Sequence, residues 1–532
     1  MNTKVYLLLL FLVFALGLTL RLYKLTSYPP LLWDEAAIGY NAYSLLLTGA
    51  DEHGVSWPLI FKSFGDYKPG LYIYLTLPSV AIFGLNTFAV RFPSALIGSL
   101  TGVLLIHFLR RRGLPPLLCF LTGLFVVFSP FNLHFSRGAW ETNLLSFLLL
   151  LFVTLFSSRR YFLSALVAGV SLYSYQAAKL IVPLIMLASA VTFPPLFNLK
   201  NVSRFFLPLF VLAIPLLLGL LNADSSRLKV VSLFSYPPAL TETNQIITEG
   251  GQLDYNLLHN RSVHYLYQFL SRYFNHLSPK FLFTSGDWPN PRHSAPYLGL
   301  LLLPSIFLLP LGLFHRFTPR NKPIFIFFFL WLIFAPIPSA LTRDSVSAVR
   351  SQSLSIPLAF FSALGVYYLF NIKSRFLKYL SLGSVFIVAS FSFVLYLDSY
   401  YNHLVRVTPF DWLYGNRQAS ELLIENQSKY QHLYFSDFYG QPYIFYLFYS
   451  GYSPARYQSS SSFSQFGPDT GSVSQIDNIT FGPINFSQLS RSSSVYAVIS
   501  FDEVMRQGIN LDDLTPISSI NNLSTYYVYH RP

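Results

Sequence analysis

Residues 31–69 read LLWDEAAIGYNAYSLLLTGADEHGVSWPLIFKSFGDYKP and directly follow the first hydrophobic segment of the chain. The stretch opens with the adjacent acids Asp34 and Glu35 and closes with Asp66, Tyr67 and Lys68. Ionisable residues beside a membrane helix are costly, and they mark sites of chemistry or ion binding. We therefore interpret the rest of the chain as a frame around this stretch.

The composition is that of a membrane protein, because 53% of the 532 residues are hydrophobic and only 11% are charged. Apolar runs of about 20 residues, the length of a membrane-crossing helix, recur along the chain. We predict an all-α polytopic membrane protein with interfacial helices and a small α/β extracytoplasmic C-terminal domain. The eleven predicted spans are 4–22, 88–109, 115–131, 142–158, 161–178, 180–197, 205–221, 296–314, 323–341, 352–371 and 377–397.

The net charge of +13 does not indicate a nucleic-acid-binding protein, since the basic residues form small clusters between apolar runs rather than one patch. The single Cys119 excludes an intramolecular disulfide framework and a cysteine-based metal site. No A-x-A-like cleavage site precedes Arg21, so we expect the first apolar segment to be a retained helix.

The basic clusters also predict which side each loop faces. The run 70–85 is short for a span and contains Pro78, so we expect it to lie in the membrane interface. All basic clusters then fall on the side of the N-terminus, which the positive-inside rule places in the cytoplasm. These clusters are Arg110 to Arg112, Arg159 with Arg160, Lys200 with Arg204, Arg316 with Arg320 and Lys322, and Lys373 with Arg375 and Lys378.

This topology predicts an integral protein of the plasma membrane with its unusual charged residues outside. Residues 1–398 are expected to form the transmembrane catalytic domain, with a first outer loop at 23–87 and a large outer loop at 222–295. Residues 399–532 are expected to form an extracytoplasmic soluble domain in a supporting or acceptor-binding role. Its strand-like segments are 432–438, 495–501 and 524–530, and its Ser-rich middle, 459–475, is expected to be a loop.

Asp34 and Glu35 stand before a helix-like segment, 36–49, whose aromatic and aliphatic side suits a helix lying on a membrane surface. An acid at a helix start is commonly an N-cap that serves stability alone. A cap requires neither a second acid nor a membrane setting, so the context favours a functional role. Lys68 has two interpretations as well: it can hold a lipid phosphate, or it can simply extend to the membrane interface, with Pro69 starting the interfacial helix.

Further charged and aromatic residues occur in the other outer segments. Arg137 and Glu141 have the spacing of a helical ion pair, which is the structural alternative to a site role. Tyr175 and Lys179 suit an aromatic belt equally well. A Gly/Pro-rich turn carries Asp287, Arg292 and His293, and the segment 340–350 adds Arg343 and Arg350, which suit a phosphate or a plain loop. We find no P-loop, dinucleotide fingerprint or G-x-S-x-G elbow.

At these residues the chain resembles the GT-C superfamily of integral-membrane glycosyltransferases, in the branch of the protein O-mannosyltransferases and lipid A aminoarabinose transferases. The resemblance rests on five short motifs. No single motif is specific to the family, but the order and spacing of the five are. The motifs are Trp33-Asp34-Glu35, Tyr67-Lys68-Pro69, Ala89-Val90-Arg91, Ser136-Arg137 with Glu141, and Arg292-His293.

The resemblance implies a polyprenyl-phosphate sugar as donor, inversion at the anomeric carbon and Asp34 as the base. It implies that Lys68 lies near the lipid phosphate and that Glu141 and His293 match family positions. Where the aminoarabinose transferases have a metal-binding acid before the lysine, this chain has Tyr67. A divalent metal ion is therefore a candidate cofactor only, with His293 and Asp66 as its candidate ligands.

We thus predict a membrane glycosyltransferase that moves a sugar to an acceptor hydroxyl on a protein, lipid or glycan, with membrane lipid as a partner and no nucleic acid. The alternatives are a polytopic transporter or lipid flippase and a non-catalytic relative that binds lipid. The predicted residues are Asp34 and Glu35 for catalysis; Lys68, Arg137, Arg292 and Lys179 for the donor phosphate; and Asp66, Tyr67, Glu141, His293, Tyr175 and Arg350 for support.

Overall fold

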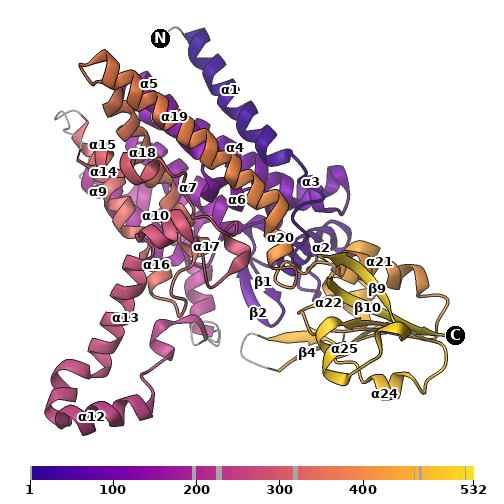
Figure 1. Ribbon diagram of the computed structural model, residues 1–532. Helices are drawn as coiled ribbons and strands as arrows, with labels where there is room; N and C mark the ends of the chain where they lie inside the picture. Colours follow the sequence, from indigo (N-terminus) through magenta and orange to yellow (C-terminus); the bar gives the residue numbers. More distant parts are fainter. Residues whose placement is uncertain are drawn as a thin grey trace. The chain divides into compact units, whose positions relative to one another are not determined.

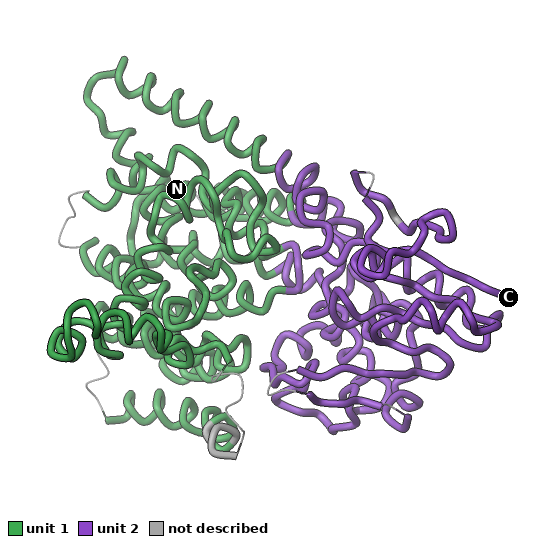
Figure 2. The backbone as a smooth tube through the Cα atoms, turned by 60° about the horizontal axis from the view of Figure 1, so that its bottom comes forward, with its two compact units in different colours: residues 1–20, 97–136, 140–397 green, residues 21–96, 137–139, 398–532 purple. Residues whose placement is uncertain are grey.

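The computed structural model of the chain is mainly helical with a sheet near the C-terminus (Figure 1). It describes residues 3–193, 199–222, 230–314, 321–460, 462–466, 470–521 and 523–532. The end of the predicted span 180–197, the start of the loop 222–295, Arg316, Arg320 and parts of the segment 459–475 lie outside the described residues. Figure 2 shows two compact units: unit 1 comprises 1–20, 97–136 and 140–397, and unit 2 comprises 21–96, 137–139 and 398–532.

Unit 1 is a bundle of apolar helices. Each of the eleven segments predicted to span the membrane contains a helix, although in 296–314 only Ser305–Leu313 is helical. These helices are α1 (Thr3–Leu22), α4 (Thr87–Arg111), α5 (Pro116–Phe128), α7 (Glu141–Ser157), α8 (Tyr161–Ser171), α9 (Ala178–Thr192), α10 (Leu199–Asn222), α14 (Ser305–Leu313), α15 (Lys322–Phe334), α18 (Ser355–Phe370) and α19 (Arg375–Asp398).

Six stretches within the described residues are long and apolar enough to cross a membrane, so the chain is an integral membrane protein. They are Thr3–Leu22, Thr87–Arg111, Leu199–Leu216, Lys322–Ala340, Ala348–Phe370 and Arg375–Val407. The other apolar helices are shorter, so eleven crossings stay a prediction.

Helix α18 is the centre of unit 1, since every residue from Ser355 to Val366 is buried. Two glycines let it approach α14 closely. A Cβ atom on Gly312 would collide with the carbonyl oxygen of Phe361, and one on Gly365 would collide with that of Leu308. Small residues at a helix crossing are the usual means of close packing in membranes, where the lipid supplies no hydrophobic drive.

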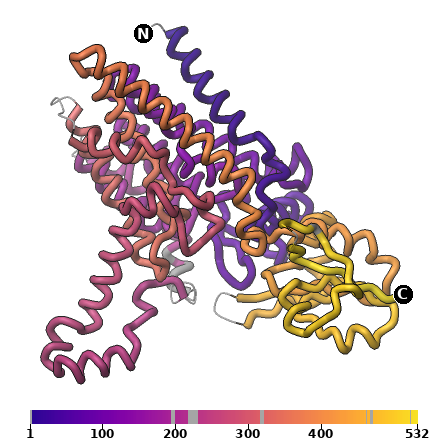
Figure 3. The backbone as a smooth tube through the Cα atoms, viewed as in Figure 1, coloured from indigo at the N-terminus to yellow at the C-terminus, as the bar shows by residue number. Residues whose placement is uncertain are grey.

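Unit 1 also contains short helices and a pair that projects from the bundle. The short ones are α6 (Pro130–Phe135), η1 (Leu233–Ser235), η3 (Lys280–Thr284), η4 (Pro291–His293), α16 (Ile337–Ala340), α17 (Ala348–Ser351) and η5 (Gln352–Leu354). The projecting segment contains α12 (Leu240–Asp254), η2 (Tyr255–His259) and α13 (Arg261–Asn275), and it is visible in Figure 3.

Unit 2 contains a six-stranded sheet of order β6-β7-β3-β8-β10-β9, in which β3 is parallel to both β7 and β8. Its strands are β3 (His432–Phe435), β6 (Gln475–Ile476), β7 (Ile479–Phe481), β8 (Val495–Ser500), β9 (Thr515–Ile520) and β10 (Leu523–Arg531). Strands β3, β8 and β10 lie where the alternating apolar pattern predicts strands. The segment 459–475 is not only a loop, because β4 (Phe463–Gln465) and β5 (Gly471–Val473) pair there.

Unit 2 has eight helices in its C-terminal part, residues 398–532, as described by the structure. They are η6 (Ser399–His403), α20 (Leu404–Val407), α21 (Asn416–Asn426), α22 (Pro442–Ser450), α23 (Pro454–Ser460), α24 (Phe486–Leu489), α25 (Phe501–Gln507) and η7 (Leu511–Asp513).

The stretch 31–69 belongs to unit 2 and forms more structure than a charged loop. Helix α2 (Trp33–Thr48) is followed by a hairpin of β1 (Ile60–Ser63) and β2 (Asp66–Pro69), and then by α3 (Leu71–Phe83). The prediction that Pro69 starts the next helix is wrong, because Pro69 ends β2, paired with Ile60. Gly70 then precedes α3. A side chain at this position would collide with the Phe61 ring, so glycine fits here.

Candidate active site

Asp34 and Lys68 form an ion pair within unit 2. Asp34 lies in the first turn of α2, where the helix dipole favours a negative charge. Lys68 lies on β2 opposite Phe61 of β1, so pairing of the two strands fixes the position of the Lys68 backbone. The Asp34 side chain is 42% exposed and the Lys68 side chain is 23% exposed. A carboxylate that can accept a proton therefore lies beside a cation that can hold a phosphate.

The N-cap interpretation of Asp34 is wrong. The cap residue of α2 is Leu32, whose backbone is extended, and Asp34 lies inside the helix. Glu35 provides the cap contact instead, because its Oε2 accepts a hydrogen bond from the Leu32 backbone N–H at 3.1 Å. Asp34 is thus not required to start the helix.

Glu35 is buried and its carboxylate is fully engaged. Arg91 of α4 donates to it twice, from Nε to Oε1 at 2.8 Å and from Nη2 to Oε2 at 2.6 Å. The backbone N–H of Ala139 donates to Oε1 at 2.9 Å. Arg91 also donates to the carbonyl oxygens of Leu25 and Pro29. This buried pair joins α2, α4 and the chain before α2, and Arg91 was not predicted as the partner of Glu35.

Arg137 is also buried in unit 2, with 1% of its surface exposed. Its Nη1 donates to the Arg21 carbonyl oxygen at 2.9 Å, and its guanidinium lies over the rings of Tyr400 and Tyr401. Arg137 and Glu141 do not lie on one helix as their spacing predicts, because α6 ends at Phe135 and α7 begins at Glu141. An ion pair between the two side chains stays a prediction.

Asp66 and Tyr67 precede Lys68 on β2 but differ in exposure. Asp66 is buried, whereas Tyr67 is 51% exposed. This alternation follows from the strand, in which neighbouring side chains point to opposite faces. The Lys68 ammonium also lies 5.7 Å from the centre of the Phe64 ring in the turn of the hairpin.

The stretch contains a further buried acid, Glu52, which sequence reasoning did not select. Asn41 Nδ2 donates to Glu52 Oε1 at 3.0 Å, and Asn41 Oδ1 accepts from the Glu52 backbone N–H at 3.0 Å. Burial raises the pKa of Glu52 to about 8, while Asn41 and Lys68 oppose the shift. Glu52 therefore holds a proton at neutral pH. The consecutive ionisable residues Asp51, Glu52 and His53 were the available signal.

The C-terminal part of unit 2 holds the first-loop elements in place. Tyr40 of α2 donates to the Tyr452 carbonyl oxygen at 3.1 Å. Gln458 of α23 donates to the Ser44 hydroxyl at 3.0 Å and to the Asp51 carbonyl oxygen at 2.8 Å. These contacts support α2 and the loop that follows it.

In unit 1, His293 is oriented by Asp287. The imidazole Nδ1 lies 2.9 Å from Asp287 Oδ2, which also accepts from the Ala348 backbone N–H at 2.7 Å. The Asp287 side chain is fully buried and the His293 side chain is 12% exposed. The His293 ring packs edge-on against Trp140 at a centroid distance of 5.4 Å. With Nδ1–H bound to Asp287, Nε2 is the nitrogen that can face a ligand.

The other predicted residues of unit 1 lie on several elements. Arg292 is in the same short turn as His293, and its carbonyl oxygen lies 2.8 Å from His134 Nε2. Lys179 of α9 donates to Gln176 Oε1 at 2.8 Å, and Tyr175 precedes this helix. Arg350 of α17 forms an ion pair with Asp344. Of these residues, Arg292 alone shares a turn with His293.

The candidate metal ligands do not form a donor set of their own. In the described parts of the chain, no group of three or more His, Cys, Asp and Glu side chains could hold a metal ion. Asp66 belongs to unit 2, and His293 is bonded to Asp287 in unit 1. A structural zinc site needs about four such ligands. The metal therefore stays a prediction, and no step below depends on it.

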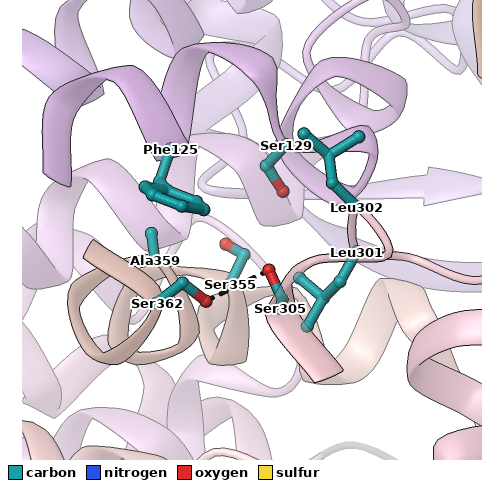
Figure 4. Close-up of a pocket in the computed structure, with 8 residues that line it drawn as sticks. All are labelled: Phe125, Ser129, Leu301, Leu302, Ser305, Ser355, Ala359 and Ser362. Atoms are coloured by element: carbon teal, nitrogen blue, oxygen red, sulfur yellow. Dashed lines mark hydrogen bonds between the residues drawn. The ribbon is translucent and has the colours of Figure 1, made fainter. Parts of the chain in front are cut away.

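A small cavity inside unit 1 contains none of the predicted site residues. Figure 4 shows the hydroxyls of Ser129, Ser305, Ser355 and Ser362 around it, and Ser362 donates to Ser305 at 3.3 Å. Ser355 in turn donates to Asn132 at 2.8 Å. These bonds satisfy hydroxyls in the helix bundle, so the cavity is part of the packing of α14 and α18.

Comparison with known proteins gives a family match over part of the chain and a fold for nearly all of it. Residues 11–194 match the family of dolichyl-phosphate-mannose-protein mannosyltransferases. This region contains Asp34, Glu35, Lys68, Arg91, Arg137 and Glu141. No curated protein sequence matches the chain.

Three solved structures share the fold over nearly the whole chain. The apo crystal structure of ArnT from Cupriavidus metallidurans aligns with a TM-score of 0.52 and 11% identity, over 97% of each chain. The same protein bound to undecaprenyl phosphate aligns with a TM-score of 0.51 and 11% identity, over 99% of this chain and 98% of that one. The Archaeoglobus fulgidus oligosaccharyltransferase in complex with zinc and sulfate aligns with a TM-score of 0.51 and 13% identity, over 98% of this chain and 73% of that one.

The matches are consistent with the order of motifs in the sequence, with the apolar helices and with the ion pair that follows the first helix. They agree with the predicted resemblance: residues 11–194 match the mannosyltransferase family, and the whole chain has the fold of ArnT.

Proposed function

We propose that the protein is a membrane glycosyltransferase that moves a sugar from a polyprenyl phosphate to an acceptor hydroxyl, with inversion at the anomeric carbon. The observation that carries this proposal is the pair of Asp34 and Lys68 at the start of α2. The family match over 11–194 supports a polyprenyl-phosphate donor and a mannosyl-type sugar. The related fold of ArnT bound to undecaprenyl phosphate supports the same lipid class.

In this reaction Asp34 accepts the proton of the acceptor hydroxyl as the hydroxyl oxygen attacks the anomeric carbon. The new bond joins that oxygen to the anomeric carbon, and the bond from the anomeric carbon to the phosphate oxygen breaks. The electron pair leaves with the polyprenyl phosphate, whose developing charge Lys68 stabilises. A single displacement inverts the anomeric centre and requires no second carboxylate to activate water.

In this proposal the ion pair holds the Asp34 carboxylate and the Lys68 ammonium in their charged forms before substrate binds. Lys68 favours the ionised form of Asp34, which is the form that can accept a proton. A donor phosphate that draws the ammonium toward itself releases the carboxylate for the acceptor. Donor binding and activation of the base are thereby coupled through one cation.

Glu35 has a different role in this proposal. Its four hydrogen bonds to Arg91, Leu32 and Ala139 leave it to position the start of α2 rather than to accept a proton. Arg137, Arg292, Lys179, Glu141, His293, Tyr175 and Arg350 are proposed as supporting groups for the donor on the basis of the family resemblance.

The proposed topology has eleven spans, with the N-terminus in the cytoplasm and the loops 23–87 and 222–295 outside the plasma membrane. Residues 399–532 then form an outer domain that supports the first loop, in keeping with the bonds from Tyr452 and Gln458. The acceptor classes are a protein Ser or Thr, a lipid-linked glycan and a cell-envelope polysaccharide.

The test is transfer from a labelled polyprenyl-phosphate sugar by the purified protein in lipid nanodiscs. Release of polyprenyl phosphate that requires Asp34 and an acceptor supports the proposal. Movement of the intact labelled lipid between leaflets without cleavage would instead identify a flippase. Binding of the lipid with neither cleavage nor movement would identify a non-catalytic relative.

A further inference from the structure

Helix α13 presents a continuous apolar stripe on its exposed side. Val263, Leu266, Tyr267, Leu270 and Phe274 are 38%, 57%, 69%, 40% and 61% exposed. Their spacing of three or four residues places them on one face of the helix. The stripe projects from unit 1, where Figure 3 shows α12 and α13 extending beyond the other helices of the bundle.

The opposite face of α13 is polar and is bound to the rest of unit 1. Tyr265 donates to the Phe234 carbonyl oxygen at 3.1 Å, and Arg272 donates to the Arg343 carbonyl oxygen at 3.2 Å. The helix is therefore held by hydrogen bonds from its polar side. A water-exposed helix buries its apolar face and exposes its polar one, so the arrangement in α13 is reversed.

This reversal requires a non-aqueous partner, since a contiguous apolar patch on a soluble surface is rare and marks an interaction site. The partner has to cover a stripe about three turns long rather than fill a pocket. Membrane lipid fits this requirement without any complementary shape.

The stripe is continuous with a membrane-crossing element. Tyr273 donates to the carbonyl oxygen of Ile333 at 2.8 Å, and Ile333 lies in the membrane-span candidate Lys322–Ala340. Tyr273, which precedes the last residue of the stripe, therefore contacts the last turn of α15. The stripe extends from there toward the N-terminal end of α13. Three more exposed leucines, Leu253, Leu257 and Leu258, lie in the segment before α13.

The charges of α13 suit a lipid surface as well. The helix contains Arg261, Arg272 and His264 and no acid. Basic residues beside an apolar face are the pattern of helices that lie at the boundary between headgroups and acyl chains. Helix α13 is not among the six candidate spans, because it has only 15 residues and one of its faces is polar.

We propose that α13 lies in the surface of the bilayer with Val263, Leu266, Tyr267, Leu270 and Phe274 in contact with acyl chains. The segment that contains α12 and α13 is then a membrane-bound arm of unit 1. The proposal does not depend on the glycosyl-transfer reaction, because it follows from exposure, hydrogen bonding and continuity with a span.

The test uses single cysteines in a Cys119→Ala background, labelled with a fluorophore whose emission depends on polarity. Leu266→Cys and Leu270→Cys report on the stripe. Ser271→Cys, exposed next to Leu270 but off the stripe, is the matched control, and Asp512→Cys in unit 2 is a distant one. The protein is placed in phosphatidylcholine nanodiscs with and without spin-labelled lipid.

We expect lipid quenching at positions 266 and 270 to be at least about twofold stronger than at 271, with position 512 unquenched. Iodide in the water phase should quench in the reverse order. Equal quenching of the three α13 labels by iodide, with none by lipid, would overturn the proposal.

A second measurement uses the unsubstituted protein, so that it does not depend on the folding of a variant. A phosphatidylcholine with a photoreactive diazirine in its acyl chain is activated in the nanodisc, and adducts are mapped by mass spectrometry. Adducts on peptide 261–275 support lipid contact. Their absence, with adducts on α15 in the same sample, contradicts it, and a cross-link between two copies through this peptide would assign the stripe to a second chain.

Discussion

Lys68, on the second strand of a short hairpin, forms an ion pair with Asp34 in the first turn of α2. The pair joins the two ends of the stretch 31–69, which are separated by the loop that contains Glu52. In a displacement reaction, the carboxylate can accept the proton of the nucleophile while the ammonium stabilises the leaving phosphate. The consequences can be measured residue by residue.

Replacing Asp34 with Asn should abolish transfer while the protein stays folded. The carboxamide cannot accept the proton of the acceptor, and loss of a general base costs about 10²–10⁴-fold in rate. Turnover is measured as release of polyprenyl phosphate, and folding as the thermal unfolding midpoint in detergent. Glu421→Gln is the matched control, because Glu421 is an exposed acid that pairs with Arg417 on α21. Turnover by Asp34→Asn equal to that of the control would rule out Asp34 as the base.

Replacing Lys68 with Met should weaken donor use, whereas Lys68→Arg should retain part of it. The methionine keeps much of the side-chain volume but removes the charge that stabilises the leaving phosphate, which is worth about 10²-fold or more in kcat/KM. Lys62→Met is the control, since Lys62 lies on the neighbouring strand of the same hairpin and its ammonium faces the Phe463 ring. Equal kinetics for the two Met variants would exclude Lys68 from the donor site.

Replacing Glu35 with Gln should lower the free energy of unfolding. The turnover per molecule of folded protein should change less. Arg91 is completely buried, so the substitution leaves its charge without a counterion. Breaking a buried ion pair costs about 3–5 kcal/mol. The measurement is the free energy of unfolding in detergent for Glu35→Gln, Arg91→Met and the double variant.

The double variant decides between pairing and independent effects. If Glu35 and Arg91 stabilise each other, the double variant should be more stable than the sum of the two single losses predicts. Strictly additive losses would show that the two side chains act independently. That result would remove the positioning role proposed for Glu35.

Several parts of this fold follow from sequence because they depend on local pattern. The apolar runs locate the helices, since membrane helices must satisfy their own backbone, and alternation locates β3, β8 and β10. The order of the motifs that contain Asp34, Lys68, Arg91, Arg137 and His293 is visible in the sequence, and the family resemblance rests on it. Lengths near the minimum, as in α5 and α8, leave the number of crossings undecided.

The errors share one physical cause, which is dependence on distant partners. Glu35 is held by Arg91, 56 positions away, so the sequence cannot separate its role from that of Asp34. The hairpin that contains Pro69 forms by pairing with β1, which local helix signals do not reveal. Burial likewise sets the protonation of Glu52, and it depends on the whole of unit 2.

Replacing Glu52 with Gln should change how stability depends on pH. The folded protein raises the pKa of Glu52 from 4.5 to about 8, so only the unfolded chain loses this proton between these values. Because the folded state then binds more protons, the free energy of unfolding falls as pH rises through this range and levels off above about 8. The stability that comes from the raised pKa of Glu52 is fully present below pH 4.5. It amounts to a few kcal/mol, at about 1.4 kcal/mol per pKa unit.

In Glu52→Gln this fall should be absent, because the amide is neutral at every pH and keeps the bond from Asn41. The unfolding free energy is measured from pH 4.5 to 8.5 in one detergent, with Glu421→Gln as the control. The two variants should differ most above pH 8, where Glu52→Gln is the more stable. Parallel pH profiles for both variants would show that Glu52 is ionised in the folded protein.

Replacing Asp287 with Asn should lower turnover through the orientation of His293. Asp287 Oδ2 fixes the imidazole through Nδ1 and adds a negative charge beside it. Outer-shell partners of this kind are worth about 10–100-fold in metal sites, which sets the expected scale. If the oriented imidazole supports the donor phosphate through Nε2, Asp287→Asn should lower kcat about tenfold or more, because the ring loses the partner that holds it in place. Asp513→Asn, at an exposed acid of η7, is the control. A variant that unfolds more readily but keeps the parental kcat would show that Asp287 only anchors the Ala348 backbone.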